Sequence, residues 1–369
     1  MLGPLCVGMS GFVVGDAPVV PPVAEDACDA HLSEPRRTGD AEPPAFAEPP
    51  LWSLLGRAVS QGPGDDRGRV AIADSKALVR GGARHGRARA ELLAAGVCAF
   101  MDARHMHTQE DSDAGAGPES PAAQAMTDLG VLDRLGVRLR PHAPAWARGV
   151  AATLPEPWGG PAAVVRARAV SAAMRRASVR CAGVWARAMF EAEFNRLTAQ
   201  AGSKAAASGA VVRDLMRQAW ALTRALGLPG LIVCDRQGGR RGYGPMLAAW
   251  LGPVGAAGVD TVAEGPQESE YVVRSGDAER SGGWDGVRVR FRVRAEGCSL
   301  PVALASMAAK LARELLMARF NAHYAGRARQ RGRPEPEPTA GYTADARRWL
   351  SQAGCILDPG EAAELVRIC

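Results

Sequence analysis

The sequence has few aromatic residues, few histidines, no close cysteine pairs and no long apolar run. Phe, Trp and Tyr make up 5% of the 369 residues, and there are six histidines. The eight cysteines form no CxxC pair, so their spacing predicts neither a zinc site nor a disulfide framework, and we interpret them as free thiols. No apolar stretch approaches the roughly 20 residues of a membrane span. The N-terminus lacks the basic start of a signal peptide. We therefore expect a cytoplasmic protein with no membrane partner.

The chain does have enough apolar residues for a large core and a modest excess of positive charge. Hydrophobic residues account for 47%, and the net charge of +6 comes almost entirely from arginine. This net charge is compatible with a nucleic-acid partner, but many soluble enzymes carry a similar charge. Only clustering of the basic residues would distinguish a nucleic-acid-binding protein from such an enzyme. We expect a monomer.

Periodicity predicts helices and strands in mixed order. The expected strands are Leu5–Val14, Arg69–Ala73, Leu231–Cys234 and Val287–Val293, the last half-exposed because apolar and basic residues alternate. The expected helices are Leu51–Val59, Ala163–Phe194, Val211–Leu226, Leu300–His323 and Thr343–Gln352. Strands interspersed with helices indicate an α/β architecture, with a mixed β-sheet flanked by helices.

Two low-complexity stretches interrupt this pattern. Residues at about 15–50 are rich in proline and acids, and residues 104–122 are rich in small and acidic residues. Such compositions are typical of flexible surface insertions. We therefore predict a single domain over residues 1–350 with two disordered insertions, followed by a C-terminal tail over residues 351–369.

Two carboxylates follow predicted strands in the second half. Asp235 ends the apolar string LIVC, and in open α/β sheets ligands meet side chains at the carboxyl ends of strands. Glu296 ends the string RAE after the basic strand, where it could bind a divalent cation or pair with a neighbouring arginine. For Asp235 the alternative is an acidic turn residue.

Polar residues also mark one face of the long C-terminal helix. Ser306, Lys310 and Arg313 are spaced i, i+4 and i+7, so they share a face that could meet a phosphate backbone. The alternative is a polar edge on a core helix. Tyr342 follows a glycine in a turn, where it could stack on a sugar or base or lie on the surface. His105 and His107 lack the matching acid or cysteine spacing of a metal site.

Together these strings resemble type 2 ribonuclease H proteins, in the order expected for that family. The matching strings are Leu2-Gly3-Pro4-Leu5 before a strand, Asp74-Ser75-Lys76-Ala77-Leu78, Asp235 after a strand, Arg294-Ala295-Glu296, and the helix Ala305-Ser306-Met307-Ala308-Ala309-Lys310 with Arg313-Glu314, followed by Gly341-Tyr342. Glu296 stands ten residues before Ser306, as in the family.

The resemblance implies a ribonuclease-H-like fold and hydrolysis of the RNA strand of RNA–DNA hybrids, or of DNA with embedded ribonucleotides. It implies two Mg²⁺ or Mn²⁺ ions held by four carboxylates, two of them Asp235 and Glu296. It also implies a set of residues that bind the nucleic acid: Lys76, Ser306, Lys310 and Arg313 at the phosphate backbone, and Tyr342 near the ribose.

The sequence departs from the family pattern in three ways. The family opens with an Asp-Glu pair that would precede Met1, and we expect the true start to lie upstream. About sixty residues separate Asp235 from Glu296, more than the family pattern predicts, and Glu314 replaces the usual aspartate. Two alternatives follow: a catalytically impaired relative that binds hybrids, or another nuclease or resolvase on a related fold.

Overall fold

The structure is a computed structural model that describes residues 1–15, 47–62, 68–75, 78, 86–110, 126–139, 143–154, 160–228, 230–276 and 286–368. The predicted α/β class is confirmed. The strands are β1 Leu5–Val14, β2 Val59–Ser60, β3 Val70–Ala71, β4 Val179–Met189, β5 Gly230–Asp235, β6 Ala256–Glu264, β7 Glu268–Ser275 and β8 Gly286–Arg292. The helices are α1 Leu51–Leu54, α2 Gly86–Glu110, α3 Asp128–Arg134, α4 Gly160–Arg176, α5 Glu191–Ala201, α6 Lys204–Leu226, α7 Gly244–Leu251, α8 Leu300–Gln330, α9 Thr343–Ala353 and α10 Glu361–Glu364, with short turns η4 Ala145–Ala147, η6 Gly252–Val254 and η8 Ala295–Gly297.

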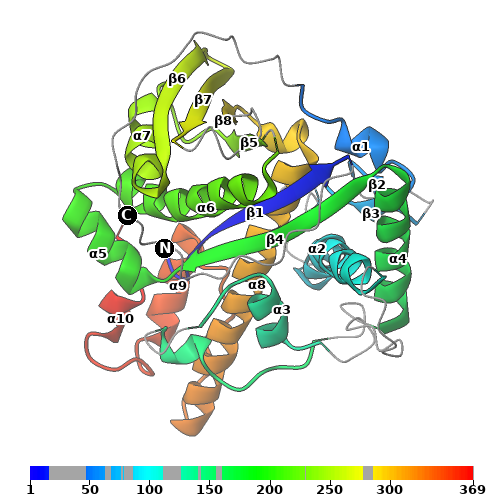
Figure 1. The fold of residues 1–369 in the computed structure, drawn as a ribbon. Coiled ribbons are helices and arrows are strands. Elements are labelled where there is room, and N and C mark those ends of the chain that lie inside the picture. The colour runs from blue at the N-terminus through cyan, green and yellow to red at the C-terminus, as the bar shows by residue number, and fades with distance from the viewer. Residues whose placement is uncertain are drawn as a thin grey trace.

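A long antiparallel ribbon of β1 and β4 organises the first part of the molecule, and α8 packs against it (Figure 1). Gly8 explains how closely α8 approaches, because a Cβ atom at this position would lie 1.9 Å from the carbonyl oxygen of Ala305. Ser10 also donates a hydrogen bond to the carbonyl of Pro301, at 2.8 Å. The main hydrophobic core forms where α2, α4, α8 and this ribbon meet.

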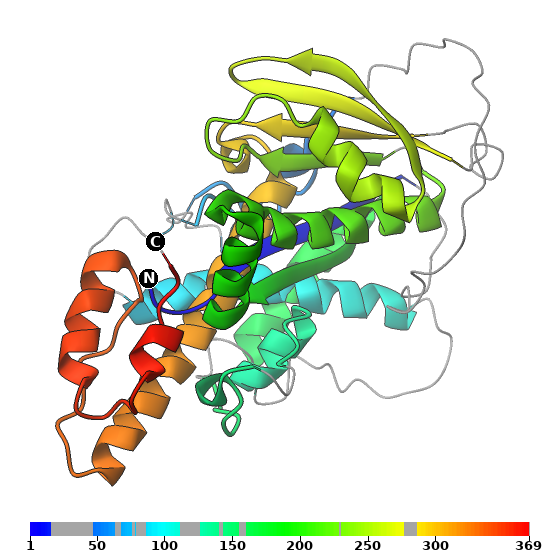
Figure 2. The same ribbon diagram turned by 90° about the vertical axis from the view of Figure 1, so that its left-hand side faces the viewer.

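A four-stranded sheet in the order β5-β8-β7-β6 forms the second part. β5 and β8 are parallel, whereas the other pairs are antiparallel. Its core joins Trp220 of α6 to Tyr243, Tyr271 and Phe291, and the rings of Tyr243 and Phe291 stack at 3.7 Å. Figures 1 and 2 show α6 between this sheet and the β1–β4 ribbon, so the helix belongs to both parts.

The helix predicted over Ala163–Phe194 is wrong in its second half. α4 ends at Arg176, Ser178 has a left-handed φ of 50°, and Val179–Met189 forms β4. The physical reason is long-range, because β4 pairs along its length with β1. Pairing with a distant strand overrides the local helical pattern.

Several predicted boundaries also change. Helix Leu51–Val59 stops at Leu54, because Val59 joins β2 and pairs with Val70. Residues 104–110 continue α2, while 16–46 and 111–125 lie outside the described residues. The predicted tail is packed: Ile356 is fully buried and Val366 forms a bridge with Leu2.

β8 is not half-exposed as predicted. Arg288 on this strand is buried and pairs with Glu270 of β7. Although burial opposes it, hydrogen bonds from Arg290 and Arg288 lower the pKa of Glu270. The alternating arginines of β8 therefore pair across the sheet instead of facing solvent.

Candidate functional site

The structure brings Asp235 and Glu296 to one edge of the sheet. β5 and β8 are hydrogen-bonded neighbours, with Asp235 opposite Arg292 in the register. Arg294 then adopts a left-handed φ of 54°, and the chain turns into η8, which contains Glu296. The backbone N–H of Ala295 donates to Oδ1 of Asp235 at 3.2 Å. The two acids, predicted from separate strings, thus follow neighbouring strand ends.

The two acids would supply oxygen ligands of the type that Mg²⁺ prefers. The Asp235 side chain is exposed and Glu296 is half-buried. Within the described residues, no group of three or more His, Cys, Asp or Glu side chains converges as a metal site. Mg²⁺ is often held by one or two carboxylates, with waters and substrate phosphates completing its shell. The pair fits an open site of that kind and not a closed protein cage.

Ser306 connects the first half of the chain to α8. Its hydroxyl lies 3.2 Å from the hydroxyl of Ser75, which is buried. The string around Asp74 and Ser75, recognised as a motif in the sequence, therefore lies beside the helix motif. Lys76 lies outside the described residues, as do the side chains of His105 and His107.

Lys310 and Tyr342 contact each other at the surface of α8. The Lys310 ammonium donates to the Tyr342 hydroxyl at 3.0 Å, pairs with Glu314 at 2.7 Å, and lies 5.4 Å from the ring centroid. Burial raises the pKa of Tyr342, but the hydrogen bond from Lys310 and its positive charge outweigh burial and lower it. Lys310 is thus held by two neighbours, and a phosphate would have to compete with Glu314 for it.

Arg313 is buried and is surrounded by backbone carbonyls. Its guanidinium donates to the carbonyls of Pro4, Leu2 and Ala340, and lies 5.2 Å from the Tyr342 ring. Gly341 has a left-handed φ of 78°, and a Cβ there would lie within 2.4 Å of the Leu2 carbonyl. Arg313 therefore joins the N-terminal segment to the Gly341 turn, which is a structural role. A contact of Arg313 with phosphate stays a prediction.

The sequence analysis did not identify a buried glutamate, Glu191, that lies near Gly3 and Arg313. Glu191 opens α5 directly after β4, is 1% exposed, and its Oε1 has no hydrogen-bond partner among the described residues. Burial raises its pKa to about 7, against the opposing effects of its own backbone N–H, Arg367, the Gly3 N–H and Arg313. The boundary between β4 and α5 would have drawn attention to Glu191, but the helix predicted over Ala163–Phe194 runs across that boundary.

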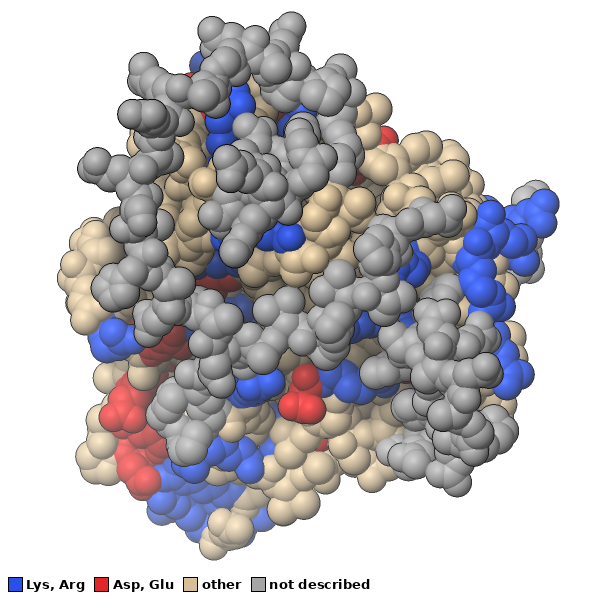
Figure 3. Space-filling model, viewed as in Figure 1, with Lys and Arg blue, Asp and Glu red and all other residues tan. Residues whose placement is uncertain are grey.

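Charge at the lower end of the molecule, as viewed in Figure 3, is mixed in sign. Figure 3 shows basic and acidic side chains next to each other at the lower end of the molecule, over the C-terminal part of α8. There Arg327 pairs with Asp358 and Glu361, and Arg331 pairs with Asp358 at 2.7 Å. These arginines stabilise the fold of the C-terminal segment and do not form a uniformly basic surface.

No helix in the described part of the chain combines the length and hydropathy that a membrane span requires. In comparisons with known proteins, no family model, no curated protein and no solved structure matches the chain. The resemblance to type 2 ribonuclease H therefore stays a prediction, which the geometry above can support but which no relative tests.

Proposed function

We propose that this chain is a metal-dependent endonuclease of ribonuclease-H-like fold that acts on the RNA strand of RNA–DNA hybrids. One observation carries the proposal: motifs far apart in the sequence converge on the first half of α8. Ser75 contacts Ser306, and Arg313 joins Pro4 to the turn before Tyr342. Asp235 and η8 lie just ahead of the same helix.

In this proposal each residue has a defined role. Asp235 and Glu296 would hold Mg²⁺ or Mn²⁺, whose chemistry is to activate water and stabilise charge on a phosphate oxygen. The remaining contacts would be made by Lys76, Ser306 and Lys310 at the phosphates, by Tyr342 at the ribose, and by Arg313 through the turn that it positions.

Binding of hybrids without cleavage is the second candidate. The observation that favours it is that no group of three or more potential metal ligands is found within the described residues. Metal ligands act together, so a partial set lowers activity far more than in proportion to the ligands lost. The same α8 surface would serve both candidates, and only the chemistry distinguishes them.

The test is cleavage of a labelled RNA–DNA hybrid with Mg²⁺ or Mn²⁺, by the wild type and by Asp235→Asn and Glu296→Gln. Under the proposal, each substitution lowers cleavage more than about 100-fold while hybrid binding persists. Asp260→Asn is the matched control, because this aspartate is exposed on β6 and pairs with Arg274. Hybrid binding without any cleavage would favour the second candidate, and absence of both would reject the proposed function.

A further inference from the structure

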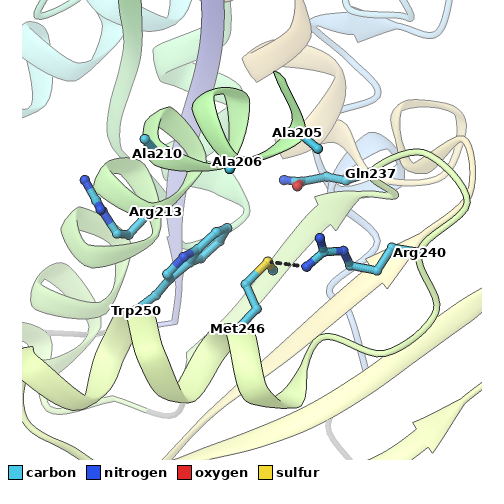
Figure 4. Close-up of a pocket in the computed structure, with 9 residues that line it drawn as sticks. Ala205, Ala206, Ala210, Arg213, Gln237, Arg240, Met246 and Trp250 are labelled. Atoms are coloured by element: carbon cyan, nitrogen blue, oxygen red, sulfur yellow. Dashed lines mark hydrogen bonds between the residues drawn. The ribbon is translucent and has the colours of Figure 1, made fainter. Parts of the chain in front are cut away.

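A pocket of about 250 Å³ opens next to the candidate site, between the N-terminal half of α6, helix α7 and the loop that joins β5 to α7. Figure 4 shows the side chains that line it. Gln237, two residues after Asp235, is one of them. The volume is just below the usual range of about 300–1,000 Å³ for small-ligand pockets, so the pocket suits a ligand no larger than a single nucleotide.

The lining combines positive charge, one aromatic ring and one amide. Arg213 of α6 and Arg240 of the loop lie at opposite ends in Figure 4, with Trp250 and Met246 of α7 between them. The described lining residues include no carboxylate. On the α6 side they are small: Ala205, Ala206, Gly209 and Ala210.

Neither arginine is fully neutralised. Arg240 is exposed and donates to the sulfur of Met246 at 3.2 Å, which is a weak acceptor. Arg213 bonds to Asp214 at 3.1 Å, and Asp214 also faces Arg187 at 3.7 Å, while Arg187 has a second carboxylate, Glu193, at 4.0 Å. Arg213 therefore shares its carboxylate with Arg187, and Arg240 has no carboxylate partner among the contacts of the described chain. The pocket therefore keeps a net positive charge. The adjacent first turn of α6 adds to it, because the N-terminus of a helix favours anions.

The loop that carries Gln237 and Arg240 is held in place before any ligand arrives. Arg236 donates to the carbonyls of Arg240 and Gly265, at 2.7 and 3.0 Å. The hydroxyl of Tyr243 accepts from the Gln237 N–H and donates to the Arg240 carbonyl. A preformed loop reduces the entropy lost on binding.

We propose that this pocket binds one unpaired nucleotide. The base would contact the Trp250 ring, the Gln237 amide would meet its edge, and the phosphate would lie with Arg213 or Arg240. Since the pocket begins two residues beyond Asp235, the inference deepens the proposed function: the nucleotide would belong to a single strand that leaves the hybrid. The same chemistry also fits a free nucleoside monophosphate.

The first experiment is calorimetric titration with adenosine monophosphate and with ribose 5-phosphate. Adenosine monophosphate should bind at least about five-fold tighter, because stacking of a base on an aromatic ring is favourable by about 1 kcal/mol or more. The double variant Arg213→Gln/Arg240→Gln should weaken its binding at least about tenfold. Arg196→Gln is the control, because this exposed arginine on α5 bonds only to Gln200 among the contacts of the described chain.

The second experiment compares a blunt hybrid with the same hybrid carrying a four-nucleotide single-stranded extension. The extension should strengthen binding about five- to tenfold in the wild type, and this gain should disappear in the double variant. If adenosine monophosphate binds as expected but the extension does not strengthen hybrid binding, the pocket is supported and its ligand is a free nucleotide.

The two proposals fail separately. If no hybrid binds but adenosine monophosphate binds and depends on Arg213 and Arg240, the proposed function is rejected and the pocket is supported. If adenosine monophosphate does not bind, binds no better than ribose 5-phosphate, or binds equally to the double variant, the inference is overturned. Arg240 is exposed and Arg213 is half-buried, so both substitutions should leave the fold intact. Matching thermal unfolding curves of the wild type and the variant check this.

Discussion

Arginines in two regions of the molecule have opposite environments. On α8, Arg313 and Arg319 are 9% and 7% exposed, and backbone carbonyls surround their guanidinium groups. Around the α6–α7 pocket, Arg240 is exposed and 39% of the Arg213 side chain reaches solvent. The sequence presents all four as equivalent positive charges, yet the first pair is buried among carbonyls and the second pair reaches solvent.

The difference shows how the same side chain serves folding or binding. Arginine offers five donors in a planar fork, so it can satisfy several carbonyls where the chain would otherwise leave them unpaired. Arg319 does this for Ala147, Gly149 and Val150, and it also pairs with Asp128 at 2.5 Å. An arginine used in this way stabilises the fold, and its charge is not available to a ligand.

The largest expected effect is on folding, from Arg319→Met. The variant would leave Asp128 buried without its partner, and breaking a buried pair costs about 4 kcal/mol. We expect that loss in the free energy of unfolding, measured in guanidinium chloride. The double variant Asp128→Asn/Arg319→Met should recover part of it. A loss below about 1 kcal/mol would contradict the contrast between the two regions.

Arg313→Met should have the next largest effect. Three carbonyls from two segments lose their donor, and we expect a loss of about 3 kcal/mol in the free energy of unfolding. Arg313→Lys restores the charge but not the fork, so it should remain destabilised. If hybrid binding falls while stability is unchanged, Arg313 acts on the nucleic acid directly and the structural interpretation is wrong.

Glu191→Gln should change the dependence of stability on pH. The folded pKa is about 7, above the ordinary value of 4.5, so between these values the folded state holds a proton that the unfolded chain releases. Wild-type stability therefore falls as pH rises from about 4.5 to 7, and the lost stability is not regained above 7. The variant should lack about 3 kcal/mol of that fall, measured as the difference between denaturation curves at pH 4.5 and 8. Parallel pH profiles of the two proteins would reject a buried, protonated Glu191.

The smallest effect on folding is expected at the pocket. Arg213→Gln/Arg240→Gln should change the free energy of unfolding by no more than about 0.5 kcal/mol, because Arg240 is exposed and the ion pair of Arg213 with Asp214 is open to solvent. Thermal and chemical unfolding check this. A larger loss would show that the pocket arginines, like those of α8, stabilise the fold.

Local signals in the sequence predict several elements well. The strand Leu5–Val14 is observed with the predicted bounds. Helix α6 ends at Leu226, as predicted, because Gly227 adopts a left-handed φ of 61°. Asp235 and Glu296 were both placed at strand ends, and the parallel β5–β8 pair puts those ends together. Each of these predictions depends on residues that are close together in the sequence.

Features that depend on distant partners were missed. β4 was predicted as helix because only its pairing with β1 makes it a strand. The same helical prediction included Glu191, so its position at the start of α5 was missed. The buried role of Arg313 depends on Leu2 and Pro4, about 310 residues away. The pocket joins Arg213 to Trp250 through the packing of two helices, for which the sequence pattern gave no signal.

The contact between Arg236 and the β6–β7 turn limits where the chain can be shortened. Arg236, the residue after Asp235, donates to the carbonyls of Gly265 and Pro266 in the turn between β6 and β7. The length of that hairpin is therefore coupled to the position of the chain beside the acid. Shortening the hairpin by two residues would withdraw the turn from Arg236. Protein engineers who trim this chain should leave the β6–β7 turn intact, however far from Asp235 it lies in the sequence.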